Sequence, residues 1–276
     1  MSRIVASSMV ALGLAATALS AETRTFEGWN IRYESPSGWR SGSRSGVAEM
    51  LVADDGSLIT IACGVDANSD EALRNLGQFL SAMQVTAVPS GEPKKTRIGG
   101  RDALVIDGQL HARDGRTFGA HFVVLFDKGG TSLWVCGIAA AGRTEAVSRD
   151  VDGIVGGADM KAPTPNQQAI AALAGAWVVD TGSFNPGLGG GDAATGTSHN
   201  ERVAFDGQGR FEYSRSSAVY VSDMPADVDP VSQVSDQGTY SVIGSALVLR
   251  GSNGTMILEM QVNGSTLVVG GKTYRR

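Results

Sequence analysis

The chain has 276 residues, of which 42% are hydrophobic and 18% are charged, so it is long enough for one or two domains with substantial cores. Its formal net charge is −5, and removal of the N-terminal segment, which carries Arg3 and no acidic residue, brings the charge to −6. A net negative charge argues against nucleic acid and against anionic membrane surfaces as partners.

Residues 1–21 have the pattern of a cleavable secretory signal peptide. Arg3 supplies the positive charge at its start, and an apolar stretch of small residues follows. The small side chains of Ala18 and Ser20 fit cleavage after Ser20, and cleavage after Ala21 fits nearly as well. The alternative is an uncleaved anchor helix, but a membrane span needs about 20 strongly apolar residues. No cysteine lies near the cleavage site and no twin arginine precedes the stretch, so we expect a periplasmic or secreted protein without a membrane anchor.

The segment after the signal combines strand and helix patterns. Two helices are expected, one with Ser69 as its N-cap and one with Thr144 as its N-cap and a pair of glycines at its end. Apolar runs typical of strands precede and separate these helices. This order predicts an α+β domain in which an antiparallel sheet carries flanking helices. The expected strands are 31–34, 48–53, 58–65, 101–106, 118–126 and 132–139.

A break in this pattern separates the two halves of the mature chain. Pro163 and Pro165 stand among polar residues and can continue neither a helix nor a central strand. We therefore expect a linker at residues 162–168, which divides the mature protein into a first domain at 22–161 and a second domain at 169–276.

The second domain consists mostly of short strand patterns with frequent turns. Asn263 and Gly264 stand between two apolar runs and form a strong hairpin signal, because both turn positions favour positive φ. Seven or so such strands predict an all-β fold, either a small antiparallel barrel or a sandwich. Long loops are expected at 181–200 and 216–237.

The first domain has an opening motif of apolar, aromatic and turn residues, followed in order by a hairpin, a helix, further strands and a C-terminal helix. The motif comprises Ile31, Tyr33, Pro36, Gly38 and Trp39, and a later strand begins with the run Gly100 to Leu104. Over about residues 26–160 this order resembles the PsbP-like domain. The resemblance implies an antiparallel sheet flanked by helices and a binding or assembly role, and it marks no residue as catalytic.

The second domain opens with a Leu-x-Gly-x-Trp motif and carries further turn and strand matches after it. These matches are Leu173, Gly175 and Trp177 at the start, Phe205 to Phe211, Gly238 to Tyr240, and Leu267, Gly271 and Tyr274 near the end. Over about residues 170–276 the pattern resembles lipocalin-like domains. The resemblance implies a small antiparallel β-barrel in place of a sandwich.

A barrel of this kind has a predicted interior. Between Met256 and Val262 every second residue is apolar, while Glu259 and Gln261 point the other way. Such residues either line a cavity for a small apolar ligand or fill a closed core, since a barrel of about eight strands leaves little room inside. The candidate lining residues are Trp177, Phe205, Phe211, Tyr213, Leu249, Met256, Leu258, Met260 and Leu267.

The two cysteines, Cys63 and Cys136, each end an apolar run. In an oxidising compartment they are able to form one disulfide, provided that their strands are neighbours with Cα atoms within about 7 Å. The alternative is two separate buried thiols, because free cysteine is often buried.

The chain has three histidines. His111 and His121 lie on neighbouring predicted strands, where they either approach each other or face solvent separately, and His199 falls in a glycine-rich stretch. Neither a nucleophile elbow nor a third metal ligand at suitable spacing accompanies them. We expect no catalytic residue, metal or cofactor.

These observations support an exported, non-enzymatic binding or envelope-assembly protein, with an unidentified protein partner or a small apolar ligand in the C-terminal barrel. The alternative is a purely structural or protein-interaction module without a ligand. An uncharacterised hydrolase that uses His111 or His121 is a third and less favoured hypothesis.

Overall fold

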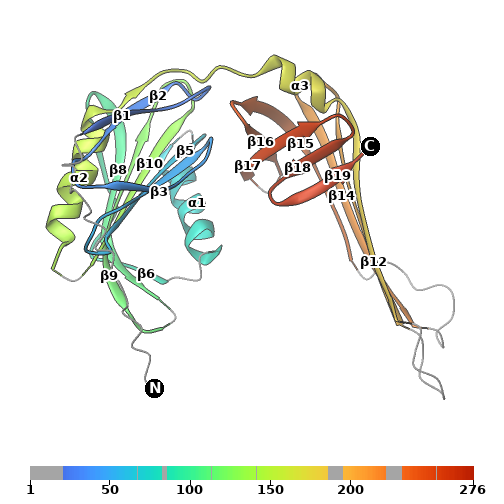
Figure 1. The fold of residues 1–276 in the computed structure, drawn as a ribbon, viewed down its shortest axis with the longest axis horizontal. Coiled ribbons are helices and arrows are strands. Elements are labelled where there is room, and N and C mark those ends of the chain that lie inside the picture. The colour runs from blue at the N-terminus through green and yellow to red at the C-terminus, as the bar shows by residue number, and fades with distance from the viewer. Residues whose placement is uncertain are drawn as a thin grey trace, which may run out of the picture.

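The computed structural model combines an α+β region with a closed antiparallel β-barrel that follows it in the chain, which confirms the expected fold class (Figure 1). The predicted signal segment and the cleavage position Ser20 lie outside the described residues. The structure describes residues 21–66, 68–82, 86–112, 114–140, 142–185, 195–221, 232–252 and 254–276.

The α+β region is organised around one antiparallel sheet. Within the described residues this sheet has eight strands, in the order β3-β4-β5-β10-β9-β8-β6, with β7 also paired to β8. Its central strands are the apolar ones, so they are buried on both faces. The strands are β3 (Arg40–Arg44), β4 (Ala48–Val52), β5 (Leu58–Gly64), β6 (Thr86–Pro89), β7 (Lys94–Ile98), β8 (Arg101–His111), β9 (Thr117–Phe126) and β10 (Ser132–Ala139).

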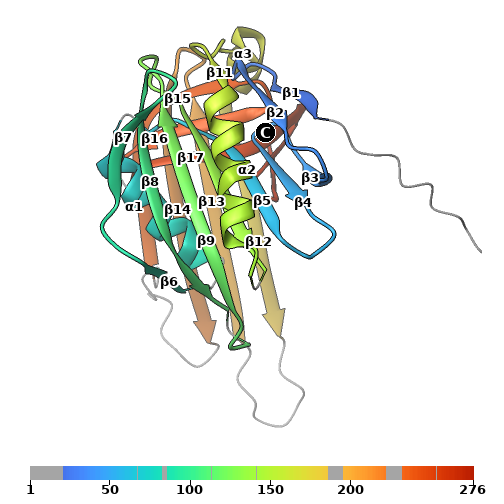
Figure 2. The ribbon, with the colours of Figure 1, turned by 90° about the vertical axis from the view of Figure 1, so that its left-hand side faces the viewer.

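Different layers cover the two faces of this sheet. Helix α2 packs on one face through an apolar stripe that includes Val147 and Val151, and a small sheet of β1, β2 and β11 lies on the same side (Figure 2). Helix α1 packs on the opposite face through Ala72 and Leu76. The bounds are α1 (Ser69–Ala82), α2 (Thr144–Gly157), β1 (Glu22–Phe26), β2 (Ile31–Ser35) and β11 (Asp159–Met160).

The predicted N-caps of both helices are wrong by one residue. The side chain of Asn68, and not that of Ser69, accepts hydrogen bonds from the backbone N–H groups of Asp70 and Glu71, each at 3.0 Å. Asparagine is as good a cap as serine, so two adjacent capping residues left the start of the helix ambiguous. In α2, Thr144 is the first helical residue, and the side chain of Arg143 at the cap position makes no capping hydrogen bond.

A buried carboxylate joins the small sheet to the central sheet. Glu49 of β4 is 1% exposed and accepts hydrogen bonds from Arg24 of β1, Tyr33 of β2 and Ser41 of β3. Burial, together with the hydrogen bond to Glu49, raises the pKa of the Tyr33 hydroxyl. The network satisfies a charge that would otherwise be costly to bury.

The C-terminal region is an up-and-down barrel in which each strand pairs with the next, and β12 closes the ring by pairing with β19 at Val178 and Arg275. The expected loops at 181–200 and 216–237 are wrong in their outer parts, which belong to strands β12 to β15 that extend well beyond the barrel (Figure 1). Their middle parts, 186–194 and 222–231, lie outside the described residues. The strands are β12 (Gly175–Asn185), β13 (Thr195–Phe205), β14 (Arg210–Val221), β15 (Ser232–Ile243), β16 (Ala246–Gly251), β17 (Gly254–Asn263), β18 (Thr266–Val269) and β19 (Lys272–Arg275).

Helix α3 (Gln167–Leu173) closes one end of the barrel. Its side chains Ile170 and Leu173 join the buried interior cluster. The indole N–H of Trp177 donates to the carbonyl of Leu173 at 2.7 Å, and the hydroxyl of Tyr240 donates to the carbonyl of Ile170 at 3.2 Å. The helix therefore serves as a plug that the barrel wall holds by side-chain hydrogen bonds.

The predicted linker is part of both regions. The backbone N–H of Thr164 donates to the carbonyl of Gly28 in the first region, and the N–H of Asn166 donates to the carbonyl of Val242 in the barrel. Barrel residues Ala246 and Val248 share a single hydrophobic cluster with the α+β core. The two regions are therefore packed against each other and do not hang on a free linker.

Among the described residues, no helix has the length and apolar character to cross a membrane.

Candidate functional site

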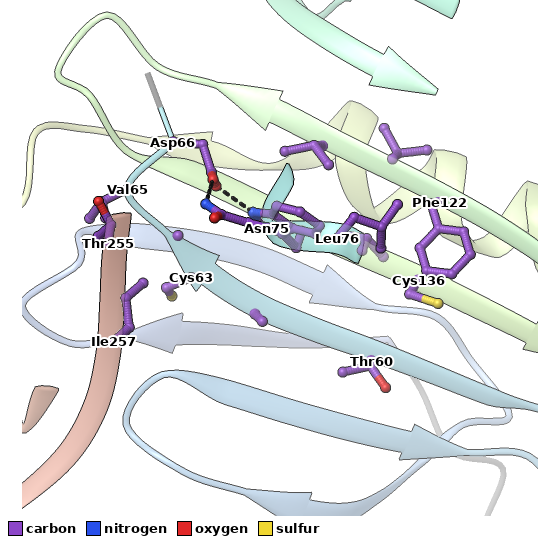
Figure 3. Close-up of a pocket in the computed structure, with 16 residues that line it drawn as sticks. Thr60, Cys63, Val65, Asp66, Asn75, Leu76, Phe122, Cys136, Thr255 and Ile257 are labelled. Atoms are coloured by element: carbon purple, nitrogen blue, oxygen red, sulfur yellow. Dashed lines mark hydrogen bonds between the residues drawn. The ribbon is translucent and has the colours of Figure 1, made fainter. Parts of the chain in front are cut away.

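An apolar cavity of about 290 Å³ lies where the central sheet, helix α1 and the barrel meet (Figure 3). Strands β5, β9 and β10 form its floor, Leu76 of α1 forms part of its wall, and Thr255 and Ile257 of β17 come from the barrel. A cavity of about 150 Å³ is known to hold one benzene molecule, so this space suits a ligand of roughly a dozen non-hydrogen atoms.

The floor follows directly from strand geometry. Side chains alternate between the two faces of a strand, so every second residue of β5, β9 and β10 faces α1. One row across the sheet aligns Ala62 with Trp134 and Trp134 with Val124. The next row aligns Cys136 with Phe122. Helix α1 covers only part of these rows, which leaves the hollow beside it.

One end of the cavity is polar and centres on Asp66, which is 3% exposed. Its Oδ2 accepts hydrogen bonds from the hydroxyl of Ser132 at 2.5 Å and from the indole N–H of Trp134 at 2.7 Å. Its Oδ1 accepts from the amide of Asn75 at 2.5 Å, as Figure 3 shows. The carboxylate folds back over Gly64, where a Cβ atom would lie 2.7 Å from Oδ2.

The two cysteines are free thiols in the structure, so the disulfide is not formed and the alternative of separate buried thiols describes them. Cys63 lies opposite Leu133, three residues before Cys136. Three residues of strand separate the two positions by about 10 Å and place them on opposite faces. Burial raises the pKa of both thiols, which makes them poor nucleophiles.

Most of the predicted barrel-interior residues belong to, or pack against, one buried apolar cluster. Side chains from both halves of the barrel pack there, and Tyr213 and Leu258 contact the same cluster from half-buried positions. Met256 does not belong to this interior, because it is 52% exposed. The predicted lining residues that are fully buried are Trp177, Phe205, Phe211, Leu249, Met260 and Leu267.

A polar cluster lies in the barrel beside this core. Glu201 is 7% exposed and accepts hydrogen bonds from the ammonium of Lys272 at 2.6 Å and from the hydroxyl of Tyr274. Burial alone would raise the pKa of Glu201, but the hydrogen bonds from these two groups lower it below its usual value. Burial of the Tyr274 hydroxyl, together with its hydrogen bond to Glu201, raises the pKa of Tyr274.

The histidines do not come together. His111 is half-buried and contacts the hydroxyl of Thr117, whereas His121 is buried beneath α2. The expectation that both face solvent is therefore wrong for His121. Its two ring nitrogens face Asp107 at 2.6 Å and Asp152 at 3.2 Å, which ties β9 to β8 and to α2. Within the described residues, no group of three or more histidine, cysteine, aspartate or glutamate side chains is placed to hold a metal ion.

The sequence pattern predicts which residues enter the barrel interior but does not reveal the cavity at the junction. The walls of the cavity come from segments that are far apart in the sequence. The alternation of side chains along a strand predicts which residues face α1. It does not predict which of these residues the helix leaves uncovered. The available signal was Asp66, an acidic residue directly after a buried apolar strand.

Fold and site together define a two-part protein, in which an α+β region and a closed β-barrel enclose an apolar cavity at their junction. No family model matches the chain, and no curated protein matches it. Among solved structures, it is similar to cyanobacterial PsbP (CyanoP) from Synechocystis, at 14% identity and a TM-score of 0.39, over 54% of this chain and 96% of that chain. It is also similar to a protein from Bacteroides thetaiotaomicron, at 13% identity and a TM-score of 0.33, over 49% of this chain and 46% of that one. At these sequence identities and TM-scores, the similarities give no information about the function of this chain.

Proposed function

We propose that this chain is an exported, non-enzymatic binding protein that holds a small apolar ligand in the cavity at the junction of its two regions. The observation that carries the proposal is the cavity itself, about 290 Å³ in volume and lined mainly by apolar side chains. Ligand sites in proteins are typically concave, mostly apolar and provided with a few polar groups, and they favour junctions between domains.

The junction is a better ligand site than the barrel interior. The barrel interior is occupied by large buried side chains such as Trp177 and Phe205, and α3 closes one end of it. A ligand there would have to displace packed side chains, whereas the junction offers space that is already formed. The proposed PsbP-like character of the first region and lipocalin-like character of the second are both compatible with a binding role.

The proposed ligand site is tested by filling it. Ala62 faces the cavity from β5, so Ala62→Phe places a ring in the space that a ligand would use. With 1-octanol as an apolar probe in titration calorimetry, we expect binding by the unmodified protein and at least a roughly tenfold weaker affinity in the variant. Ala171→Phe, on the exposed side of α3, is the matched control and should bind like the unmodified protein. Equal affinity in both variants, or no binding by the unmodified protein, would contradict the proposal.

The proposed export rests on the pattern of residues 1–21 and has its own test. The protein recovered from the periplasm or the medium should begin at Ala21 or Glu22, as read by N-terminal sequencing. A product that retains Met1 and stays in the cytoplasm would contradict it.

A protein-interaction module without a ligand is the alternative function, and one observation favours it. Among the described residues, β12 pairs with β19 only at Val178. The part of β12 that extends beyond the barrel therefore pairs only with β13. Exposed strand edges of this kind are able to add a strand from a partner. Failure of 1-octanol to bind, together with capture of a partner that protects this edge from hydrogen exchange, would favour the alternative.

A further inference from the structure

The polar end of the junction cavity combines a buried carboxylate with neutral partners. Asp66 accepts its side-chain hydrogen bonds from Ser132, Trp134 and Asn75, none of which carries a charge. Among the described residues, none of the ion pairs includes Asp66. Burial of a carboxylate is costly unless it is paired with an opposite charge as well as hydrogen-bonded. The negative charge is therefore the feature of this cavity that a ligand would recognise.

The carboxylate also has capacity for a further donor. An ionised aspartate offers about four lone-pair sites, two on each oxygen. Ser132 and Trp134 both donate to Oδ2, while Asn75 donates to Oδ1. Among these side-chain contacts, Oδ1 therefore keeps one acceptor position, and Asp66 belongs to the cavity lining.

The surroundings of Asp66 suit an organic cation with an apolar body. Trp134 lines the cavity next to the carboxylate and donates its indole N–H to Oδ2, which holds the carboxylate at this end of the cavity. Beyond this end, the lining is apolar and includes Leu76, Phe122 and Ile257. A cation at Asp66 would leave its hydrocarbon part against these side chains.

Resting on the proposed function, we propose that the junction cavity selects amphiphilic amines, with the ammonium group at Asp66 and the hydrocarbon part on the apolar floor. The ammonium donates a hydrogen bond to Oδ1 and compensates the buried charge. A neutral alcohol of the same length gains only the apolar contacts, and a carboxylate of the same length is repelled by Asp66.

Three probes of equal chain length test this selectivity. We expect n-octylamine to bind the unmodified protein roughly tenfold or more tightly than 1-octanol, and octanoate to bind more weakly than both, by titration calorimetry at neutral pH. In Asp66→Asn, which removes the charge and keeps the size of the side chain, the affinity for n-octylamine should fall to that for 1-octanol. Circular dichroism of the variant checks that it is folded, and the comparison in the unmodified protein needs no variant.

The outcomes separate this inference from the proposed function. Equal binding of n-octylamine and 1-octanol, or an amine preference that persists in folded Asp66→Asn, would overturn the inference and leave an apolar ligand site. Absence of 1-octanol binding in the unmodified protein, or binding that Ala62→Phe does not weaken, would overturn the proposed function itself.

Discussion

Glu201 illustrates at the scale of one residue how the barrel accommodates a buried charge. Val203 and Phe205 on the same face of β13 lie in the apolar interior, and Glu201 continues that face into a polar layer. Lys272 and Tyr274 hold its carboxylate in the ionised form. The carboxylate therefore stabilises the fold only where the pH keeps it ionised.

The substitution Glu201→Gln should destabilise the protein at neutral pH and have little effect in acid. The folded pKa is lower than the usual value of 4.5, so the stabilisation is complete above that value and is lost as the pH falls through the lowered pKa. Hydrogen bonds to charged groups contribute about 1.5–3 kcal/mol, and a loss of this order is expected at pH 7 in urea denaturation. Glu212→Gln, at an exposed position of β14, is the matched control. An equal loss for Glu201→Gln at acidic and neutral pH would show that charge is not the cause.

The burial of the two cysteines predicts that their thiols react with a thiol reagent only after the protein is unfolded. Burial raises the pKa of Cys63 and Cys136, so neither thiol should react with Ellman's reagent in the folded protein at mildly alkaline pH. Both should react once the protein is unfolded in denaturant without a reducing agent. If unfolding releases no thiol, a disulfide is present and the strand register around these residues differs from the one described.

At the scale of elements, helix α3 has only seven residues, so its N-cap contributes a large part of its stability. Asn166 accepts a hydrogen bond from the backbone N–H of Ala169 at 3.0 Å, and its own N–H binds the barrel carbonyl of Val242. Helices this short are marginal in isolation, so α3 depends on this cap and on its buried apolar residues.

Removal of the cap by Asn166→Ala should therefore loosen the barrel plug. Loss of a helix N-cap costs about 1 kcal/mol, and we expect a decrease of that order in the free energy of unfolding. Asn166→Asp, which keeps the capping oxygen, should retain most of the stability. Hydrogen exchange at Ile170 provides the local readout, and unchanged exchange in the alanine variant would contradict the role given to the cap.

The elements that the sequence predicted correctly are those with apolar side chains on a buried face. Strands β5 and β10 and both long helices belong to this group, because burial imposes the periodicity. The outer part of β15 was interpreted as a loop because Ser232 to Gln237 are polar except for Val234 and largely exposed on both faces, so no alternation remains. The polar strands β3 and β7 were missed for the same reason.

The cavity at the junction could not be predicted by such local rules. Its two sides meet through pairing of β5 with β10 and through docking of β17, and both are long-range contacts. The barrel core was predictable, because Trp177, Leu267 and their neighbours follow a strand period. Whether such a core is hollow depends on side-chain volumes and on the α3 plug, which periodicity does not reveal.

At the scale of the whole molecule, the backbones of Gly28 and Gly244 come close together where the two regions meet. Gly28 has φ +79°, and a Cβ atom on it would lie 2.5 Å from the backbone nitrogen of Gly244 in the barrel. Gly38 has a similar φ of +84° but open space where its Cβ would stand. A comparison of substitutions at Gly28 and Gly38 therefore distinguishes the free-energy cost of backbone strain from the cost of pushing the two regions apart.

Gly28→Ala should therefore destabilise the protein more than Gly38→Ala does. A positive φ costs an L-residue about 1–2 kcal/mol, which both variants incur. The close approach in Gly28→Ala should add about 1–3 kcal/mol, the usual cost of overpacking. Urea denaturation measures the difference, and hydrogen exchange of β15 and β16 should increase only in Gly28→Ala. Equal losses in the two variants would indicate that the regions are not closely packed at this point.

The location of a bound apolar probe distinguishes a ligand site at the junction from a ligand site in the barrel. In a heteronuclear NMR titration with 1-octanol, we expect saturable shifts of the Trp134 indole N–H and the Ile257 methyl signals, because both line the junction cavity. The Trp177 indole and Leu267 methyl signals in the barrel interior should remain unchanged. Saturable shifts of the barrel signals with no change at Trp134 and Ile257 would place the ligand in the barrel and contradict a ligand site at the junction.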